Sequence, residues 1–326
     1  MSIPHLTFVG RRLLQAIPLL FAVVIFSFTI LHLSRGDIAD VMAGESGAAS
    51  PAILRDIRHS FGLDQPAMTQ LAELGSRVIR FNLGKSLRYD KPVTDVIFER
   101  TLPTLLLTTT SMFISLILGV ACGAVAALNR GTIIDDAIFV ISLITYATPM
   151  FWTGLLLIIL FSARLDWLPT SGMTDAALET HGLSYVVDVL RHLLLPSVTL
   201  STVHFAIYTR LMRASLLEVA GLDYVRTAQA KGLPRHRILI KHMLPNALLP
   251  IVTMAGVQAG ALLGGAVLVE TVFAWPGLGR LTYEAVFQRD YPLLTGILIL
   301  TSFLVVAVNI VIDIIYSVLD PRISIR

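Results

Sequence analysis

The chain has 326 residues, of which 55% are hydrophobic and 14% are charged, and its formal net charge is +3. Soluble globular proteins carry about 25% charged residues, so this composition excludes an ordinary water-soluble protein. The long apolar runs described below predict an all-α protein that crosses a membrane several times. The basic excess fits the cytoplasmic loops of a membrane protein better than a nucleic-acid surface. The single cysteine, Cys122, excludes a disulfide framework and a cysteine-based metal site.

The first apolar run extends from about Leu13 to Leu33 and follows Arg11 and Arg12. A basic lead before an apolar run is also typical of a signal peptide. However, this run is longer than the usual apolar region of about 7–15 residues, and no small-residue cleavage site follows it promptly. We therefore predict an uncleaved transmembrane anchor helix over residues 1–34, with a signal peptide as the alternative.

Residues 35–100 are mixed in character and are predicted to form an extracytoplasmic region with short helices. Ser50-Pro51 is a typical helix start, and that helix would continue to Arg58. Between Met68 and Phe81 the apolar residues recur at helical intervals, which predicts a second short helix.

Five further apolar runs approach or exceed the roughly 20 residues needed to cross about 30 Å of hydrocarbon. They form a predicted core over residues 101–319, ahead of a cytoplasmic tail at 320–326. These spans are Leu102–Leu128, Ala137–Phe161, Leu193–Met212, Leu248–Val269 and Leu293–Leu319. The Thr148-Pro149 step predicts a kink or break halfway along the second of them, because proline cannot donate a helical hydrogen bond. The segment Ser162–Arg191 is predicted to be a polar loop.

The distribution of charge predicts the orientation of the spans. In the loop 213–247, lysine and arginine residues far outnumber the acids Glu218 and Asp223. Short loops rich in lysine and arginine stay in the cytoplasm. This loop and both chain ends are therefore predicted to be cytoplasmic, which makes the chain an N-in, C-in protein with six transmembrane helices.

Few ionisable residues fall inside the predicted spans. His204 and Asp313 are the main ones, with His32 near the outer end of the first span. Each has two open interpretations, a polar contact between helices or a role in transport, but ion-coupled carriers usually contain more such groups.

Motifs typical of zinc hydrolases, of nucleophile elbows and of dinucleotide sites are absent from the sequence. Gly84-Lys85-Ser86 lacks the upstream glycine of a phosphate-binding loop, since that position is Ile79. The chain is therefore predicted to have no catalytic residues and to bind no nucleotide itself.

Two glycine ridges are expected to take part in helix packing. Gly256, Gly260 and Gly264 recur every four residues in Leu248–Val269, and a shorter ridge at 119 and 123 lies in Leu102–Leu128. Small residues at this spacing let helix backbones approach closely. The ridge at 256–264 would pack either within this chain or against a second, similar membrane subunit, and both interpretations are open.

The cytoplasmic loop contains a predicted two-turn helix over Tyr224–Lys231. Asp223 is a favourable N-cap, and Gly232 followed by Pro234 is a typical helix end with a left-handed residue. A short amphipathic helix that projects from a membrane protein fits a groove in a partner. Its small apolar face consists of Tyr224, Val225 and Ala228. The charged residues beside this face are Arg226 and Lys231.

This loop resembles the "EAA…G…LP" loop of ABC-importer permeases. The matching positions are Arg226-Thr227-Ala228, Gly232 and Leu244-Pro245, with Arg226 in place of the glutamate of the generic motif. Further segments resemble, in order, the first permease subunit of dipeptide, oligopeptide and nickel importers. They are FGLDQP at 61–66, NLGKSLR at 82–88, ETVFAWPGLGRL at 270–281, RDYPLL at 289–294 and LDPRI at 319–323, so the resemblance covers nearly the whole chain.

The resemblance implies the architecture of a type I ABC-importer permease in the bacterial cell inner membrane. That family pairs two homologous permease subunits with two cytoplasmic ABC ATPases, which bind ATP and Mg²⁺, and an extracytoplasmic solute-binding protein delivers the solute. The chain itself would hold no cofactor or metal and would contact the lipid bilayer but no nucleic acid. The alternatives are a stand-alone ion-coupled secondary transporter and a membrane-embedded hydrolase. Peptide is the expected solute class, although the sequence does not identify the solute.

Two groups of residues receive roles from the resemblance. The predicted loop helix would be the coupling helix that seats in an ATPase subunit. Trp275, Pro276 and Gly277 would shape an outer gate or a contact with the binding protein, or would form a rigid re-entrant turn. The residues implied to couple to the ATPase are Asp223, Tyr224, Arg226, Thr227, Ala228, Lys231, Gly232, Leu244 and Pro245.

Overall fold

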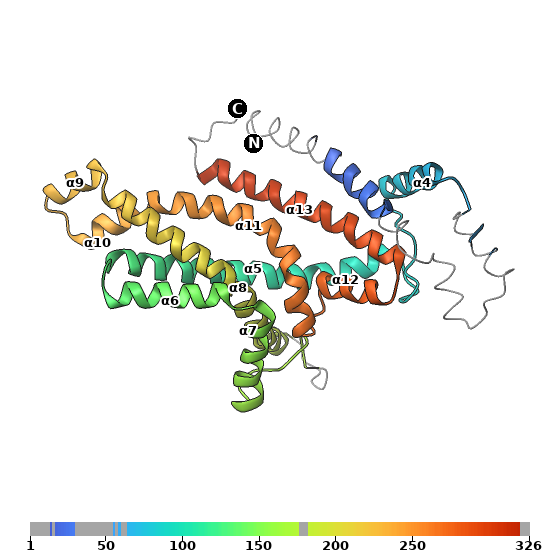
Figure 1. Ribbon diagram of the computed structural model, residues 1–326, viewed down its shortest axis with the longest axis horizontal. Helices are drawn as coiled ribbons and strands as arrows, with labels where there is room; N and C mark the ends of the chain where they lie inside the picture. The colour runs from blue at the N-terminus through green and yellow to red at the C-terminus, as the bar shows by residue number, and fades with distance from the viewer. Residues whose placement is uncertain are drawn as a thin grey trace. The chain divides into compact units, whose positions relative to one another are not determined.

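In the computed structural model, the regular structure of the chain is helical over the part that is described (Figure 1). That part comprises residues 14, 17–29, 55, 58, 59, 64–175 and 182–319, with the backbone alone at 259, 261–263, 265 and 312–319. One isolated antiparallel β-bridge joins Lys85 and Pro92. The helices are Ile17–Thr29, α4 Ala67–Ile79, α5 Val93–Leu128, α6 Ile133–Ala147, α7 Met150–Leu157, the π-helix η1 Ile158–Arg164, α8 Leu183–Ala220, α9 Asp223–Ala230, α10 Arg235–Ile238, the π-helix η2 Leu239–Met243, α11 Leu244–Val272, α12 Leu278–Phe287 and α13 Tyr291–Leu319.

The chain divides into two compact units. The first holds mainly residues 1–102 and 281–310, and the second holds mainly residues 103–280 and 311–324. The predicted boundaries at residues 34, 100 and 319 stay predictions. The second unit contains the loop 213–247 and the turn around Trp275, and the first contains α4 and the start of α13.

Four helices in the described part are long and apolar enough to cross a membrane, at Val93–Leu128, Leu183–Ala220, Arg235–Gln258 and Tyr291–Val311. The bent pair Ile133–Ala147 and Met150–Arg164 makes a fifth if it counts as one span. These five overlap the five spans predicted over 101–319. The first predicted span is described only as the apolar helix Ile17–Thr29, so the total of six stays a prediction.

The predicted break at Thr148-Pro149 is confirmed. α6 ends at Ala147, Thr148 has extended backbone angles (φ −79°, ψ 129°), and α7 begins after Pro149. The two helical arms are bent by 105°. The bend follows from the local chemistry, because proline has no backbone N–H to donate and disfavours the helical conformation in the residue before it.

The polar loop predicted for Ser162–Arg191 is wrong over its last part. α8 begins at Leu183 and continues for 38 residues, so it extends well beyond the predicted span on both sides. One of the acids of the predicted loop, Asp188, has a partner inside the helix, where His192 Nδ1 lies 3.2 Å from Asp188 Oδ1 one turn earlier. Such pairs at a four-residue spacing are compatible with a helix.

The short helix predicted over Met68–Phe81 is confirmed as α4, which ends two residues earlier, at Ile79. Phe81 has a positive φ of 53°, which stops the helix before the predicted end. The helix predicted from Ser50 to Arg58 lies outside the described residues except at 55 and 58.

Close helix packing in the second unit depends on two glycines of α5. A Cβ atom placed on Gly119 would lie 2.6 Å from the Cβ of Tyr208, and one placed on Gly123 would lie 2.5 Å from the carbonyl oxygen of Thr209. Real side chains do not approach that closely, so these glycines let the backbones of α5 and α8 come together.

Candidate functional site

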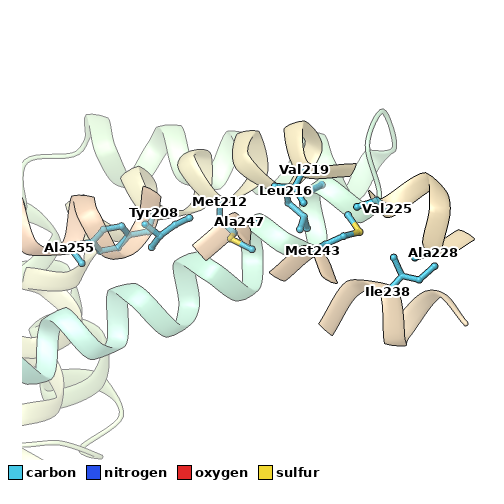
Figure 2. Packing of buried hydrophobic residues seen from close by; sticks show 12 residues of the cluster. Tyr208, Met212, Leu216, Val219, Val225, Ala228, Ile238, Met243, Ala247 and Ala255 are labelled. Carbon is cyan, nitrogen blue, oxygen red and sulfur yellow. The ribbon is translucent and has the colours of Figure 1, made fainter. Parts of the chain in front are cut away.

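The loop 213–247, which is predicted to be cytoplasmic, folds as a compact tip on two long helices. α9 follows the end of α8, and α10 and η2 then run into α11 (Figure 1). Figure 2 shows buried side chains of all these elements in one continuous apolar cluster. Its buried members include Leu216 and Val219 of α8, Val225 and Ala228 of α9, Ile238 of α10, Met243 of η2 and Ala247 of α11. The loop is therefore anchored to both α8 and α11.

This packing corrects the prediction that the apolar face of the loop helix is available to a partner. Val225 and Ala228 are 0% and 5% exposed, so the chain's own core covers them and they are not available to a partner. Tyr224 is 40% exposed. The surface that α9 presents outward is thus mixed, with one aromatic ring beside exposed polar and basic side chains. Arg226, Thr227 and Lys231 are all exposed.

Asp223 is not the N-cap that the sequence suggested. The N-cap is Leu222, no side chain caps the helix, and Asp223 is the first helical residue, so α9 lies one residue earlier than predicted. The Asp223 side chain is 98% exposed, and its Oδ1 lies 3.8 Å from Nη1 of Arg226. A carboxylate in the first turn still interacts favourably with the helix dipole.

Gly232 ends α9 with a left-handed conformation, as predicted, at φ 72°. Around it the N–H of Gly232 donates to the carbonyl of Gln229 at 2.9 Å, and the N–H of Leu233 donates to that of Ala228 at 3.3 Å. Leu233 then packs against the apolar cluster. This arrangement is typical of a glycine-terminated helix. It sets the direction of α9 relative to the segment that follows it.

Leu244 and Pro245 begin α11 at the base of the tip. Leu244 is partly buried against the cluster, and Pro245 is exposed at the start of the helix. Close by, the Ser215 hydroxyl of α8 donates to the carbonyl of Ala247 at 2.9 Å. The two long helices are therefore joined by both a hydrogen bond and the apolar cluster.

At the opposite end of α11, a tight turn is built around a buried carboxylate. Glu270 is fully buried, and its Oε1 accepts a hydrogen bond of 2.7 Å from the Thr104 hydroxyl. Its Oε2 accepts one of 3.0 Å from the N–H of Arg280. The Thr104 oxygen in turn accepts from the N–H of Leu278 at 2.7 Å. Sequence reasoning did not single out Glu270, although it begins the quoted segment ETVFAWPGLGRL.

Trp275 belongs to the same turn and has no exposed surface. Its Nε1 donates to the carbonyl of Pro103 at 2.9 Å. A Cβ placed on Gly277 would overlap the Glu270 carboxylate. These contacts favour the rigid-turn interpretation for Trp275, Pro276 and Gly277, because the Trp275 ring cannot itself reach a partner in this arrangement. A gate or a binding-protein contact stays a prediction for the segment as a whole.

A second buried carboxylate holds α6 against α8. Both Arg213 Nε and Nη2 donate to Asp135, at 2.7 Å each, and the N–H of Gly131 donates to Asp135 Oδ2 at 3.0 Å. The Asp135 side chain is 7% exposed and that of Arg213 is 35% exposed. Two parallel hydrogen bonds between ions of opposite charge fix both distance and orientation.

We expect Asp135 and Arg213 to be energetically coupled, so that the double substitution lowers the unfolding temperature by less than the sum of the two single substitutions. The measurement is a double-mutant cycle with Asp135→Asn and Arg213→Gln, using thermal unfolding of the purified protein in detergent. Asp136→Asn is the matched control, because Asp136 is the exposed neighbour. Additive effects of the two substitutions would contradict the coupling.

In the first unit, two of the quoted motifs meet at a third buried carboxylate. Asp290 Oδ2 accepts from the Ser86 hydroxyl at 2.5 Å and from the N–H of Arg88 at 3.1 Å. Its Oδ1 accepts from the N–H of Leu293 at the start of α13. Ser86 of Gly84-Lys85-Ser86 is therefore engaged in holding NLGKSLR against RDYPLL.

The remaining predicted residues are not gathered into one site. Gly256 is buried, Gly260 is half-buried and Gly264 is exposed, with no atom within 4 Å of a Cβ placed on it. His204 is 8% exposed and its Nδ1 has no hydrogen-bond partner within the described part. The side chains of Asp313 and His32 lie outside the described residues. Among the residues described, no three His, Cys, Asp or Glu side chains are grouped as ligands of a metal ion.

Comparison with known proteins gives consistent matches. The model of the family "binding-protein-dependent transport system inner membrane component" matches residues 119–325, and that of the N-terminal membrane component of the same systems matches residues 5–109. The chain is 38% identical to the di/tripeptide transport system permease protein DppB of Pseudomonas aeruginosa, over 98% of both chains. It is 37% identical to the dipeptide transport system permease protein DppB of Escherichia coli, again over 98% of both. The glutathione transport system permease protein GsiC of Escherichia coli is 40% identical, over 98% of this chain and 99% of the relative.

Among solved structures, a chain of the MetNI methionine ABC transporter in inward-facing conformations matches with a TM-score of 0.55. The match covers 70% of this chain and 97% of that chain, at 21% sequence identity. At this identity the likeness concerns the fold alone, and that fold is the one expected for a type I importer permease.

Proposed function

The chain belongs to the family of binding-protein-dependent transport system inner membrane components, and from this membership we propose that α9 is its coupling helix, the element that seats in an ATPase subunit. The chain is a multi-pass permease subunit of an ABC importer in the bacterial inner membrane. It is a transport component and not an enzyme. Its relatives favour this function over that of a stand-alone ion-coupled transporter.

The observation that carries the proposal is the exposed, rigidly held tip formed by α9. Its outer side offers Tyr224, Arg226 and Lys231. Its inner side is locked into the core through Val225 and Ala228. A short helix that is fixed on one side and free on the other fits a groove in a soluble partner.

The packing of the tip supports a mechanical role. Because one cluster joins α9 to α8 and α11, and Ser215 ties those two helices together, a displacement of α9 moves both long helices. ATP-driven closure of the ATPases would thus be transmitted to the spans as a rigid-body rotation. ATP and Mg²⁺ would be bound by the ATPases, and the chain would contribute no cofactor.

The proposed assembly contains this chain, a second homologous permease, two ATPase subunits and an extracytoplasmic solute-binding protein. Gly264 supports packing against the second permease, since its surface is open. We propose short peptides as the solute, because the relatives that match over nearly the whole chain are named as permeases of di/tripeptide, dipeptide and glutathione transport systems.

Copurification tests this function directly. The tagged chain, purified from its native membranes in mild detergent, should retain ATPase polypeptides and a second permease, and the preparation should hydrolyse ATP. Stripped of its partners, the chain should show no ATP hydrolysis above background. ATP hydrolysis that survives their removal and disappears on Lys85→Ala would refute the proposal.

A further inference from the structure

Helix α4 carries more apolar surface than the described part of the chain covers. Projected at about 100° per residue, its apolar residues form two adjoining faces. The inner face is Leu71, Leu74 and Val78, which are half-buried. The outer face is Met68, Ala72 and Ile79, which are exposed, and both Met68 (79%) and Ile79 (81%) show most of their surface. No residue of α4 is fully buried.

The remaining side of α4 is polar. It carries an ion pair between Arg77 and Glu73 and, near the end of the helix, Arg80. A helix with one broad apolar side and basic residues on the other is typical of segments that lie in the plane of a membrane surface. Arginine side chains there extend their charged ends toward lipid phosphates while their methylene groups stay near the apolar layer.

The position of α4 along α13 supports a lipid partner. In the first unit, α13 is closely packed near its start, where Leu293, Ile297 and Ile299 are buried. From residue 301 to 310 its side chains are only partly buried or exposed. Counting back about 20 residues, or 30 Å, from the end of the apolar run at Leu319 sets the outer limit of the hydrocarbon near Leu300. α13 therefore changes from protein-packed to lipid-facing at about this level.

The segment just after α4 contacts α13 near residue 300, the estimated outer limit of the hydrocarbon. The ring of Phe81 lies 6.1 Å from the ring of Phe303, centroid to centroid. Phe81 is itself 59% exposed. The exposed apolar face of α4 is thus continuous with the lipid-facing surface of a membrane span.

We propose that α4 is an interfacial helix that lies on the outer leaflet of the bilayer. Met68, Ala72 and Ile79 enter the boundary between headgroups and acyl chains, and Arg77 and Arg80 lie at the level of the phosphates. The region predicted as simply extracytoplasmic would then be attached to the membrane surface through α4. This attachment holds the segment 82–88 near the membrane surface.

Fluorescence quenching tests the proposal in the full-length chain, in the complex in which it is purified. After Cys122→Ala, single cysteines at Met68, Ile79 or Ser76 carry an environment-sensitive fluorophore, and the protein is placed in nanodiscs of phosphatidylethanolamine and phosphatidylglycerol. Lipids with a nitroxide near the top of the acyl chain should quench the probes at 68 and 79 at least threefold more than the probe at 76. Iodide in the water should give the opposite order. Ser76 is the matched control because it lies on the polar side of the same helix.

Three outcomes would overturn the proposal. Strong iodide quenching at both 68 and 79 would mean that the outer face of α4 is in water. Shielding that arises only when the solute-binding protein is added would mean that this face docks a soluble protein. Shielding from iodide without quenching by the lipid nitroxides would mean that another membrane subunit covers it. All three sites are exposed, so the probes themselves should not disturb folding.

Discussion

Gly232→Val is expected to abolish solute uptake while the chain still inserts into the membrane. Gly232 has φ 72°, and a Cβ placed on it meets no atom within 4 Å. The side chain therefore has room, and the only penalty is the left-handed backbone, which costs about 1–2 kcal/mol for an ordinary residue and more for a β-branched one. The loop relieves this strain by re-aiming α9, because both of its ends are anchored in long helices. A shift of about 1 Å is enough to spoil a catalytic or seated contact.

The substitutions Gly232→Asn and Gly221→Val separate backbone geometry from other effects. Asparagine tolerates positive φ better than other residues, so Gly232→Asn should keep most of the activity. Gly221 lies at the other end of α9 with φ −81°, so valine there should have little effect. The measurements are uptake of radiolabelled alanyl-alanine in cells and retention of ATPase subunits during purification. Equal damage from Asn and Val at position 232, or normal uptake with Val, would contradict the explanation.

Glu270→Ala is expected to produce a large loss of stability. It leaves the Thr104 hydroxyl and the Arg280 N–H without their acceptor in a buried site, and each orphaned donor costs about 1–3 kcal/mol. The cavity left by the side chain adds to this cost. The turn that holds Trp275 packs directly over the carboxylate, so it should lose its structure together with that site.

Thermal unfolding in detergent and the amount of protein in the membrane measure this effect. Glu218→Ala is the control, because Glu218 is an exposed carboxylate on α8 and its removal should change stability little. Thr104→Val should be intermediate, since it removes one donor to Glu270 and the acceptor of the Leu278 N–H. An unchanged unfolding temperature for Glu270→Ala would show that the carboxylate has no part in holding the turn.

Several features of the fold follow from short stretches of sequence. The break at Thr148-Pro149 depends on the proline ring alone, and the end of α9 depends on a glycine that can take positive φ. The spans over 101–319 follow from runs of apolar residues, because a helix in hydrocarbon satisfies its own backbone. The loop prediction failed over residues 183–191, which form the start of α8 and place Asp188 one turn before His192.

The inner side of α9 could not be assigned from its own residues. The predicted apolar face consisted of Tyr224, Val225 and Ala228. In the structure, Val225 and Ala228 are buried in one cluster with Ile238 and Met243, which follow them in the chain. The sequence of a two-turn helix does not reveal which part of its apolar surface the rest of the chain covers. The exposed surface of the candidate coupling helix is therefore smaller and more polar than expected.

What the sequence determines by itself is the apolar spans over 101–319, the break at Thr148-Pro149 and the short helix that ends at Gly232, because each depends on residues within a few positions of one another. The tertiary structure alone decides the three buried carboxylate sites. Asp135 meets Arg213 across 78 residues, Glu270 meets Thr104 across 166, and Asp290 meets Ser86 across 204. No local sequence pattern identifies such partners. An acidic residue in a loop or at a helix end is expected to be exposed to solvent unless the arrangement of the helices is known. Each carboxylate is stable in its buried position only because the fold brings donors to both of its oxygens.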